Sequence, residues 1–144
     1  MQGSVRVHGS CAARNGDAVL MIGPPGSGKS DLVLRLLGRG FMLVADDQVD
    51  VTNGCASPPL PLAGLLETRG LGIVRLPYMA SARLALVVRL GMLAPRLPVP
   101  ARHEMLDLPL IHLDSQAASA PDRVALALDC ATGKVAQVAG AFAA

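Results

Sequence analysis

The feature that most constrains this chain is the segment Gly-Pro-Pro-Gly-Ser-Gly-Lys-Ser at residues 23–30. It matches the pattern G-x-x-x-x-G-K-[ST] at every specified position. An unbroken apolar run, residues 18–22, precedes the segment, and residues 30–37 follow it with apolar side chains spaced for one face of a helix. A strand that leads through a glycine-rich turn into a helix is the usual frame for binding phosphate. The motif therefore predicts an α/β fold with a phosphate site.

The residue types in this loop suit a nucleotide. Glycines let backbone N–H groups converge on phosphate oxygens, and we expect Lys29 to reach the β- and γ-phosphates while the Ser30 hydroxyl binds Mg²⁺. ATP is the expected nucleotide, since the sequence has no persuasive guanine-reading N-K-x-D element. The predicted nucleotide-binding residues are Gly23, Pro24, Pro25, Gly26, Ser27, Gly28, Lys29 and Ser30.

Composition narrows the class further. The chain has 144 residues, 51% of them hydrophobic and 17% charged, which suits one compact domain with a buried core. A net charge of +2 and an aromatic content of 2% argue against a nucleic-acid binder. The longest apolar stretch, residues 84–94, is interrupted by Arg89 and Gly91 and is too short to span a bilayer. Three widely spaced cysteines without a metal-ligand pattern, and no signal peptide, lead us to expect a cytoplasmic protein without membrane partners.

The order of predicted elements indicates one domain, residues 1–144, with a mixed central sheet and flanking helices. No internal repeat or linker is evident. The proline-rich residues 93–109 are the segment whose conformation the sequence predicts least. We expect a loop at 53–64 and a short helix or a frayed end at 135–144. The predicted strands are residues 5–13, 18–22, 41–45, 70–76, 84–89 and 122–128, and the predicted helix is residues 30–37.

Two consecutive carboxylates, Asp46 and Asp47, end the predicted strand 41–45. The carboxyl ends of strands in open α/β sheets line the ligand crevice. Because consecutive strand side chains point to opposite faces, one Asp can face a metal ion while the other faces an incoming nucleophile. A hydroxyl that attacks a γ-phosphoryl group benefits from a carboxylate that accepts its proton. The alternative is a solvated turn or a helix cap.

Several further motifs carry a resemblance to a known family. Val7-His8-Gly9, the glycine-rich loop, Arg-Gly-Phe-Met-Leu-Val-Ala-Asp-Asp at residues 39–47, and Glu-Thr-Arg-Gly-Leu-Gly-Ile at residues 67–73 follow one another in this order. In this set and order the chain resembles the catalytic domain of the HPr serine kinase/phosphorylase family, from about Val5 to about Arg89. The resemblance implies the fold of that family's C-terminal domain, in a short form that consists of the catalytic domain only.

The resemblance also implies an activity. Members use Mg·ATP to phosphorylate a seryl hydroxyl on HPr, the small phosphocarrier protein of the phosphotransferase system, and remove that phosphate by phosphorolysis with inorganic phosphate. They assemble as hexamers, so the resemblance predicts a homo-oligomer. Longer members carry a Pro-Val-Arg-Pro-Gly-Arg-Asn-like segment tied to dephosphorylation, whereas residues 106–113 hold neither arginine nor asparagine. Kinase activity is therefore the firmer half of the expectation.

The family pattern assigns roles to individual residues. His8, Lys29 and Arg89 become catalytic residues, and Asp47 becomes the proton acceptor in phosphorylation and the donor in the reverse reaction. Ser30, Glu67 and Asp46 form the expected metal site, the first two by resemblance and Asp46 as the second acid of its pair. Glu67 offers the oxygen ligand that Mg²⁺ prefers. Arg69 either clamps phosphate or pairs with a carboxylate, a choice that the sequence leaves open.

Two other functions fit the phosphate loop. The first is a small-molecule kinase, which needs a lid, and only the proline-rich residues 93–109 are a candidate for one. The second is a nucleotide-binding sensor or assembly module without catalysis. The sensor would keep Lys29 and Ser30 but tolerate loss of Asp47.

Overall fold

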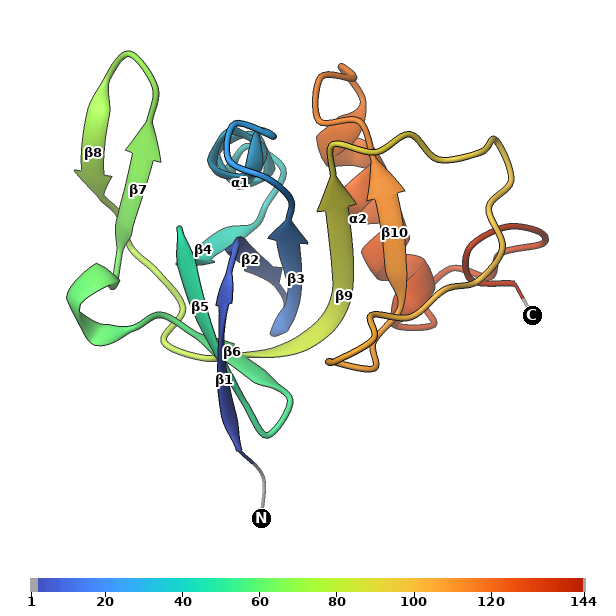
Figure 1. Ribbon diagram of the computed structural model, residues 1–144, viewed down its shortest axis with the longest axis horizontal. Coiled ribbons are helices and arrows are strands. Elements are labelled where there is room, and N and C mark those ends of the chain that lie inside the picture. The colour runs from blue at the N-terminus through green and yellow to red at the C-terminus, as the bar shows by residue number, and fades with distance from the viewer. Residues whose placement is uncertain (1–2, 144) are drawn as a thin grey trace.

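The computed structural model describes residues 3–143 (Figure 1). Its regular elements follow one another along the chain without long helical segments, and strands predominate. In order they are β1 (Ser4–His8), β2 (Ser10–Arg14), β3 (Asp17–Ile22), α1 (Lys29–Leu37), β4 (Met42–Ala45), β5 (Gln48–Thr52), β6 (Cys55–Ser57), the 3₁₀ turn η1 (Leu60–Leu62), β7 (Leu65–Thr68), β8 (Gly72–Arg75), β9 (Ala82–Leu90), β10 (Leu110–Leu113) and α2 (Ala120–Ala131).

Eight strands within residues 3–143 form one mixed sheet in the order β1-β5-β6-β9-β3-β2-β4, and β10 pairs with β9 outside this path. Strands β3, β9 and β10 are mutually parallel, whereas β2 is antiparallel to both β3 and β4. Strand β4 therefore runs in the same direction as β3. Consequently the segments that follow β3, β4 and β10 all emerge at one edge of the sheet. The mixed central sheet with flanking helices confirms the predicted fold class.

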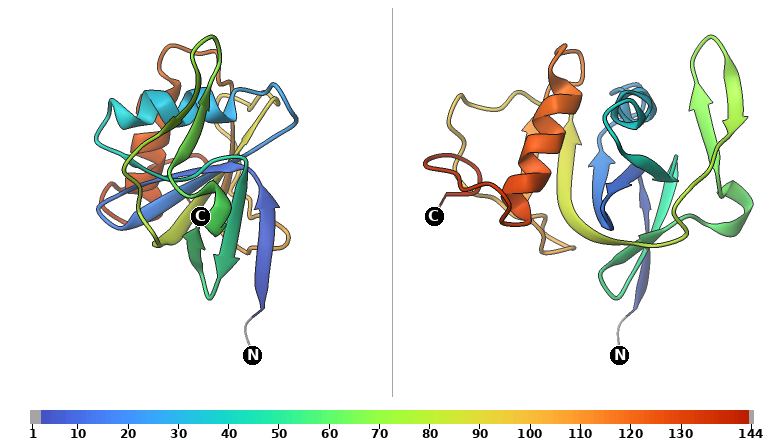
Figure 2. Two further views of the ribbon diagram at one scale, coloured as in Figure 1. Left: turned by 90° about the vertical axis from the view of Figure 1, so that its left-hand side faces the viewer. Right: turned by 180° about the vertical axis from the view of Figure 1, so that it is seen from behind.

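The two described helices pack side by side on one face of the sheet (Figure 2). On α1 the side chains of Leu32, Val33 and Leu36 are completely buried in this layer, which explains the apolar spacing seen in the sequence. Strand β3 is buried at every position because both of its faces are covered. A second apolar cluster fills the opposite face, where β5 and β6 curl over the sheet. Neither of the helices among residues 3–143 has the length and apolarity to cross a bilayer.

Two sharp corners fold the sheet and bring its distant strands together. Gly9 is the corner between β1 and β2, and Asp46-Asp47 is the corner between β4 and β5. The corners are joined by a hydrogen bond of 3.1 Å from the Gly9 N–H to the Asp47 carbonyl oxygen. A Cβ at Gly9 would lie only 2.6 Å from the Met21 carbonyl oxygen, so the first corner requires glycine. Asp47 takes a left-handed φ of +70° at the second corner.

The local predictions for residues 18–22, 30–37 and 41–45 are confirmed by β3, α1 and β4. Those for 70–76 and 84–89 are also confirmed, by β8 and β9. These segments have long or unbroken apolar patterns, which local sequence specifies well.

Three predictions are wrong. A single strand at residues 5–13 is instead two strands, because the Gly9 corner interrupts it. Residues 122–128 lie in α2 and not in a strand; Val124, Ala127 and Leu128 are buried at helical spacing. The loop expected at 53–64 contains β6 and η1.

The structure decides the conformation of two further regions. Residues 93–109, the segment that the sequence predicted least, have no regular element apart from one isolated bridge. Within the described part of 135–144 the chain forms turns and no helix.

Candidate active site

The glycine-rich loop, residues 23–28, joins β3 to α1 at the edge where the parallel strands end. Gly23, Gly26 and Gly28 have φ values of +150°, +81° and +95°, which other residues rarely adopt. Among the backbone hydrogen bonds of residues 3–143, none uses the N–H groups of Gly26, Gly28, Lys29 or Ser30. These donors at the start of a helix form a cradle that suits a phosphate group.

The side chain of Lys29 lies along this loop. Its Nζ donates hydrogen bonds to the carbonyl oxygens of Gly23 at 2.9 Å and Pro24 at 3.1 Å. The ammonium is thereby held beside the cradle, where a phosphate oxygen can replace one of the carbonyls. This placement suits the role that the motif predicts for Lys29.

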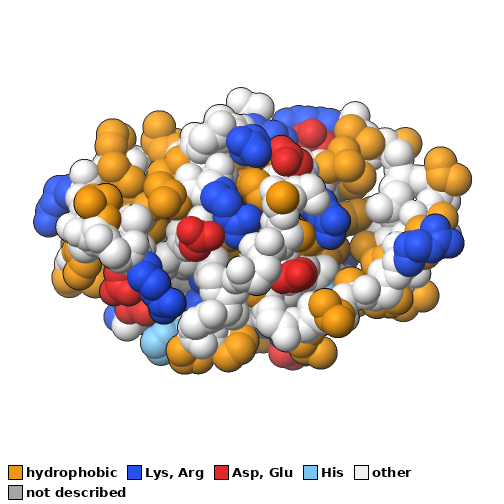
Figure 3. Space-filling model, turned by 90° about the horizontal axis from the view of Figure 1, so that it is seen from above, with side chains coloured by type: hydrophobic (Ala, Val, Ile, Leu, Met, Phe, Trp, Pro, Cys, Tyr) orange, Lys and Arg blue, Asp and Glu red, His pale blue; other side chains and the backbone are white. Residues whose placement is uncertain are grey.

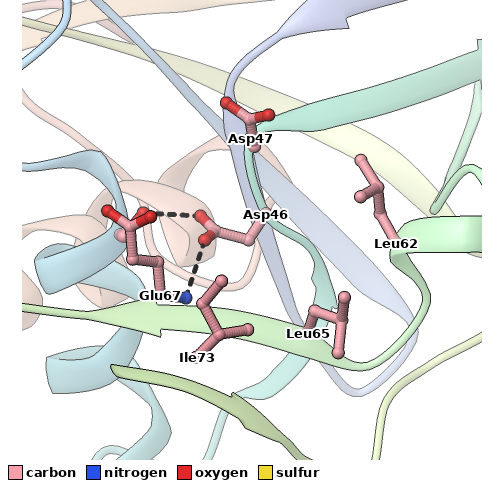
Figure 4. Close-up of a pocket in the computed structure, with 7 residues that line it drawn as sticks. Asp46, Asp47, Leu62, Leu65, Glu67 and Ile73 are labelled. Atoms are coloured by element: carbon pink, nitrogen blue, oxygen red, sulfur yellow. Dashed lines mark hydrogen bonds between the residues drawn. The ribbon is translucent and has the colours of Figure 1, made fainter. Parts of the chain in front are cut away.

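Asp46 connects three parts of the molecule. Its Oδ1 accepts hydrogen bonds from the hydroxyls of Ser10 in β2 and Ser30 in α1, each at 2.7 Å. Its Oδ2 accepts the backbone N–H of Glu67 in β7 at 3.2 Å (Figure 4). Asp46 as a residue is 6% exposed, so these bonds satisfy a buried carboxyl group. Asp46 therefore orients Ser30 and the strand that carries Glu67.

Asp47 points elsewhere. Figure 4 shows its carboxylate directed away from that of Asp46. The left-handed backbone at Asp47 turns the chain between β4 and β5, which leaves this side chain exposed while its neighbour is buried. The two acids thus point in different directions, with Asp46 bonded to Ser30 and Asp47 exposed.

Two adjoining cavities meet at these residues. The larger, about 570 Å³, lies in the size range of small-molecule sites. The smaller, about 230 Å³, places Asp46, Asp47 and Glu67 beside Leu62, Leu65 and Ile73. The lining of the larger cavity is Ser10, Pro25, Gly26, Gly28, Lys29, Ser30, Asp31, Leu34, Asp47, Glu67, Thr68, Arg69 and Gln116.

The surface around this edge carries both signs of charge. Viewed from above, acidic and basic side chains are interspersed across its middle, and hydrophobic side chains gather on the left (Figure 3). The hairpin β7–β8 occupies the left of the molecule in Figure 1, and its Leu71 and Ile73 are 74% and 67% exposed. An apolar surface therefore borders the end of the site where Asp47 and Glu67 lie.

The oxygen atoms at the cavity junction fit a magnesium ion. Ser30, Asp46 and Glu67 offer a hydroxyl and two carboxylates, and Mg²⁺ prefers such ligands. Within residues 3–143 no group of three or more His, Cys, Asp or Glu side chains is gathered as a metal cage. Mg²⁺ in nucleotide sites is bound by one or two carboxylates together with phosphates and water, so the residues present are compatible with it.

Two predicted catalytic residues line neither cavity. His8 is the exposed last residue of β1, next to the Gly9 corner. Arg89 lies in β9, with its guanidinium 3.7 Å from the Glu104 carboxylate. The pKa of Glu104 is held below its usual range, first by a hydrogen bond from its own backbone and then by His103 and Arg89. Of the eight predicted loop residues, Gly23, Pro24 and Ser27 also lie outside the cavity linings.

Sequence reasoning missed Ser10 and Gln116. Ser10 follows the Gly9 corner and donates to Asp46, a relationship that no local pattern signals. Gln116 follows β10, a four-residue strand that was not predicted. Arg69, which the sequence left open between two roles, lines the larger cavity and makes no ion pair among the described residues.

A comparison with protein families shows which family this chain resembles. The model described as "HPr Serine kinase C-terminal domain" matches residues 1–89 of this chain. That range covers β1 through most of β9, and therefore includes the glycine-rich loop, both acids and Glu67.

Curated relatives match over a similar region. The HPr kinase/phosphorylase of Clostridium tetani is 42% identical over 78 residues, which are 51% of this chain and 26% of that protein. The HPr kinase/phosphorylase of Lacticaseibacillus casei is 46% identical over 74 residues, 47% of this chain and 23% of that protein. The chain thus spans about a quarter of the length of these relatives.

Solved structures extend the similarity in fold beyond residue 89. The HPr(Ser) kinase/phosphatase from Coxiella burnetii superposes with a TM-score of 0.76 at 22% sequence identity. The match covers 90% of this chain and 92% of that one. The fold is therefore shared along nearly the whole chain.

Proposed function

Because the chain belongs to the HPr serine kinase C-terminal domain family, we propose that it is a Mg·ATP-dependent kinase of a seryl hydroxyl on an HPr-like phosphocarrier protein. One observation carries the proposal. The free amides of the glycine-rich loop, Lys29, Asp47 and Glu67 all line one cavity. The same cavity is thus lined by backbone donors that suit a phosphate and by a carboxylate that can accept a proton.

Different residues have different roles in phosphoryl transfer. The loop amides and Lys29 bind the phosphates and offset the charge that builds up on them. The exposed carboxylate of Asp47 orients the seryl hydroxyl and accepts its proton as the oxygen attacks the terminal phosphorus. Ser30, Glu67 and Asp46 hold Mg²⁺, with Asp46 also fixing the Ser30 hydroxyl. When bound, Mg²⁺ would neutralise negative charge on the phosphate oxygens.

A protein acceptor is supported by the walls around Asp47. In the smaller cavity Leu62, Leu65 and Ile73 lie beside the acids, and the neighbouring hairpin is apolar and exposed. Side chains that flank a seryl group on a protein can pack there, whereas a small polar metabolite gains nothing from this surface.

Purified chain, labelled ATP, Mg²⁺ and a purified HPr-like carrier test the proposal. The carrier should acquire phosphoserine, and Asp47→Asn should lower the rate by about 100-fold or more, since general-base catalysis contributes on that scale. Asp122→Asn is the matched control, because this acid is exposed and pairs with Arg39 away from both cavities. Transfer by Asp47→Asn at the rate of the unsubstituted chain would refute the role of Asp47.

The same assay separates the competing functions. A small-molecule kinase would consume ATP only with a metabolite acceptor, and a sensor module would bind ATP without transfer to either. The intact Asp46, Asp47 and Glu67 around one cavity favour a kinase over a sensor.

Phosphorolysis is the less supported part of the proposal. In that reaction an oxygen of inorganic phosphate attacks the phosphoseryl phosphorus, pyrophosphate forms, and Asp47 returns a proton to the serine oxygen. No residue of 106–113 lines either cavity, and Leu106 and Leu108 pack against the core. Release of pyrophosphate from phosphorylated carrier measures this activity directly.

Assembly is a prediction from the resemblance, and location is a prediction from the cysteine pattern and the lack of a signal peptide. We propose a homo-oligomer, hexameric as in the family, in the cytoplasm. Light scattering of the purified chain measures the first, and fractionation of cells measures the second.

A further inference from the structure

The connection between β10 and α2, residues 114–119, lies directly against the glycine-rich loop. The Ser115 hydroxyl, which is buried, donates a hydrogen bond of 2.6 Å to the Ser27 carbonyl oxygen. The fit is close enough that a Cβ at Gly28 would lie 2.7 Å from the Ser115 Oγ. The connection is therefore part of the loop's wall.

A second set of contacts fixes the backbone on either side of Gln116. The Arg35 guanidinium, on α1, donates to the carbonyl oxygens of Ser115 and Ala117. The Asp114 carboxylate accepts the Gln116 backbone N–H at 2.9 Å. The Gln116 side chain itself is exposed, lines the larger cavity and makes no hydrogen bond within residues 3–143. The backbone at Gln116 is thus fixed, and its side-chain amide faces the cavity without a hydrogen-bond partner among the described residues.

The larger cavity has two chemically different ends. Asp47, Glu67 and Arg69 come from the β4–β5 corner and the β7–β8 hairpin, whereas Gln116 comes from the β10–α2 connection. Figure 1 shows the hairpin and this connection on opposite sides of α1. The glycine-rich loop enters α1 between them.

A nucleotide has a reactive end and a nucleoside end. If its terminal phosphate faces Asp47, its nucleoside must leave the loop on the other side, which is the side of Gln116. We infer that Gln116 contacts the base of the bound nucleotide and that residues 114–117 form the wall of the base subsite. This inference rests on the proposed function.

The chemistry of the side chain supports this assignment. A glutamine amide offers a donor and an acceptor in one plane, which match the hydrogen-bonding edge of a purine. It carries no charge, so it has no net Coulomb interaction with the phosphates. Its removal should weaken contact with a base and leave contact with the phosphates as it was.

Titration calorimetry with two probes tests the inference. ADP carries the base, whereas inorganic tripolyphosphate presents phosphates alone. Gln116→Ala should weaken ADP binding by about fivefold, the scale of one neutral hydrogen bond, with tripolyphosphate binding unchanged. Ser119→Ala is the control, because Ser119 lies in the same connection, outside both cavities, and its side chain does not cap α2.

The outcomes separate this inference from the proposed function. Equal ADP affinity for Gln116→Ala and the unsubstituted chain would overturn the inference and leave nucleotide binding intact. Equal weakening of ADP and tripolyphosphate would also overturn it, because Gln116 would then act through the loop. If the unsubstituted chain bound neither probe, the proposed function would fail, and the inference with it.

Discussion

The hydroxyl of Ser30, in the first turn of α1, donates a hydrogen bond of 2.7 Å to the carboxylate of Asp46 at the end of β4. The bond joins the phosphate cradle to the acidic corner across the intervening strand β2. It holds the Ser30 oxygen toward the cavity that Asp47 and Glu67 also line. This contact therefore ties the first turn of α1, which follows the glycine-rich loop, to the corner that carries the two acids.

Replacing Asp46 should reduce stability as well as activity. Asp46→Ala removes the acceptor for the buried Ser10 hydroxyl, for Ser30 and for the Glu67 N–H. Loss of a buried acceptor leaves its donors unsatisfied and costs about 2 kcal/mol. Chemical denaturation measures the change, with Asp122→Ala, an exposed ion-pair member, as the control that should change little. An unaltered free energy of unfolding in Asp46→Ala would contradict this account.

The two lysines of the chain form a matched pair. Lys29→Ala should weaken ADP binding by about tenfold or more, because a charge-assisted contact to phosphate is lost. Lys134→Ala should leave binding unchanged, since Lys134 is exposed and lines neither cavity. Calorimetry with both variants provides the measurement. Equal affinities would show that Lys29 does not contact phosphate.

Gly9→Ala should destabilise the fold. The added Cβ would meet the Met21 carbonyl oxygen at 2.6 Å in the centre of the sheet, and backbone there cannot move easily. Overpacking of this kind costs about 1–3 kcal/mol. Gly3→Ala is the control, because a Cβ at that position meets nothing within 4 Å. Thermal unfolding of both proteins distinguishes them, and equal midpoints would argue against a steric requirement at the corner.

His8 and Arg89 can be tested apart from nucleotide binding. Neither residue lines either cavity, so His8→Ala and Arg89→Ala should leave ADP affinity unchanged. If the roles implied by the family hold, phosphorylation of the carrier should nevertheless fall by about tenfold or more in each variant. Calorimetry measures the ADP affinity, and transfer assays on the same preparations measure the rate of carrier phosphorylation. Normal transfer rates would remove these residues from the catalytic set.

The three cysteines should react at different rates. Burial raises the pKa of the Cys11 thiol, which keeps it from forming the reactive thiolate at neutral pH. Cys55 and Cys130 are partly exposed. Mass spectrometry after iodoacetamide treatment should therefore show Cys55 and Cys130 labelled well before Cys11, and denaturant should remove the difference. Early labelling of Cys11 in buffer would indicate that the sheet opens readily.

Local sequence predicted β3, α1 and β4 because each has an apolar pattern long enough to specify one structure. It failed at α2, where the seven residues 122–128 fit a short alternation, although tertiary packing buries them at helical spacing. Strand β10 was missed because four residues hold little local signal. The family prediction is confirmed, since its motifs lie where the sequence is most distinctive.

The sequence by itself determined the glycine-rich loop, the acidic pair and the family, because these depend on residue types that stand close together along the chain. Only the tertiary structure decided which distant groups meet them. Sheet order places Ser10 beside Asp46, and the parallel alignment of β3, β9 and β10 brings Gln116 to the same edge as Lys29. Strand pairing joins segments far apart in sequence, and no local pattern records which strands will be neighbours.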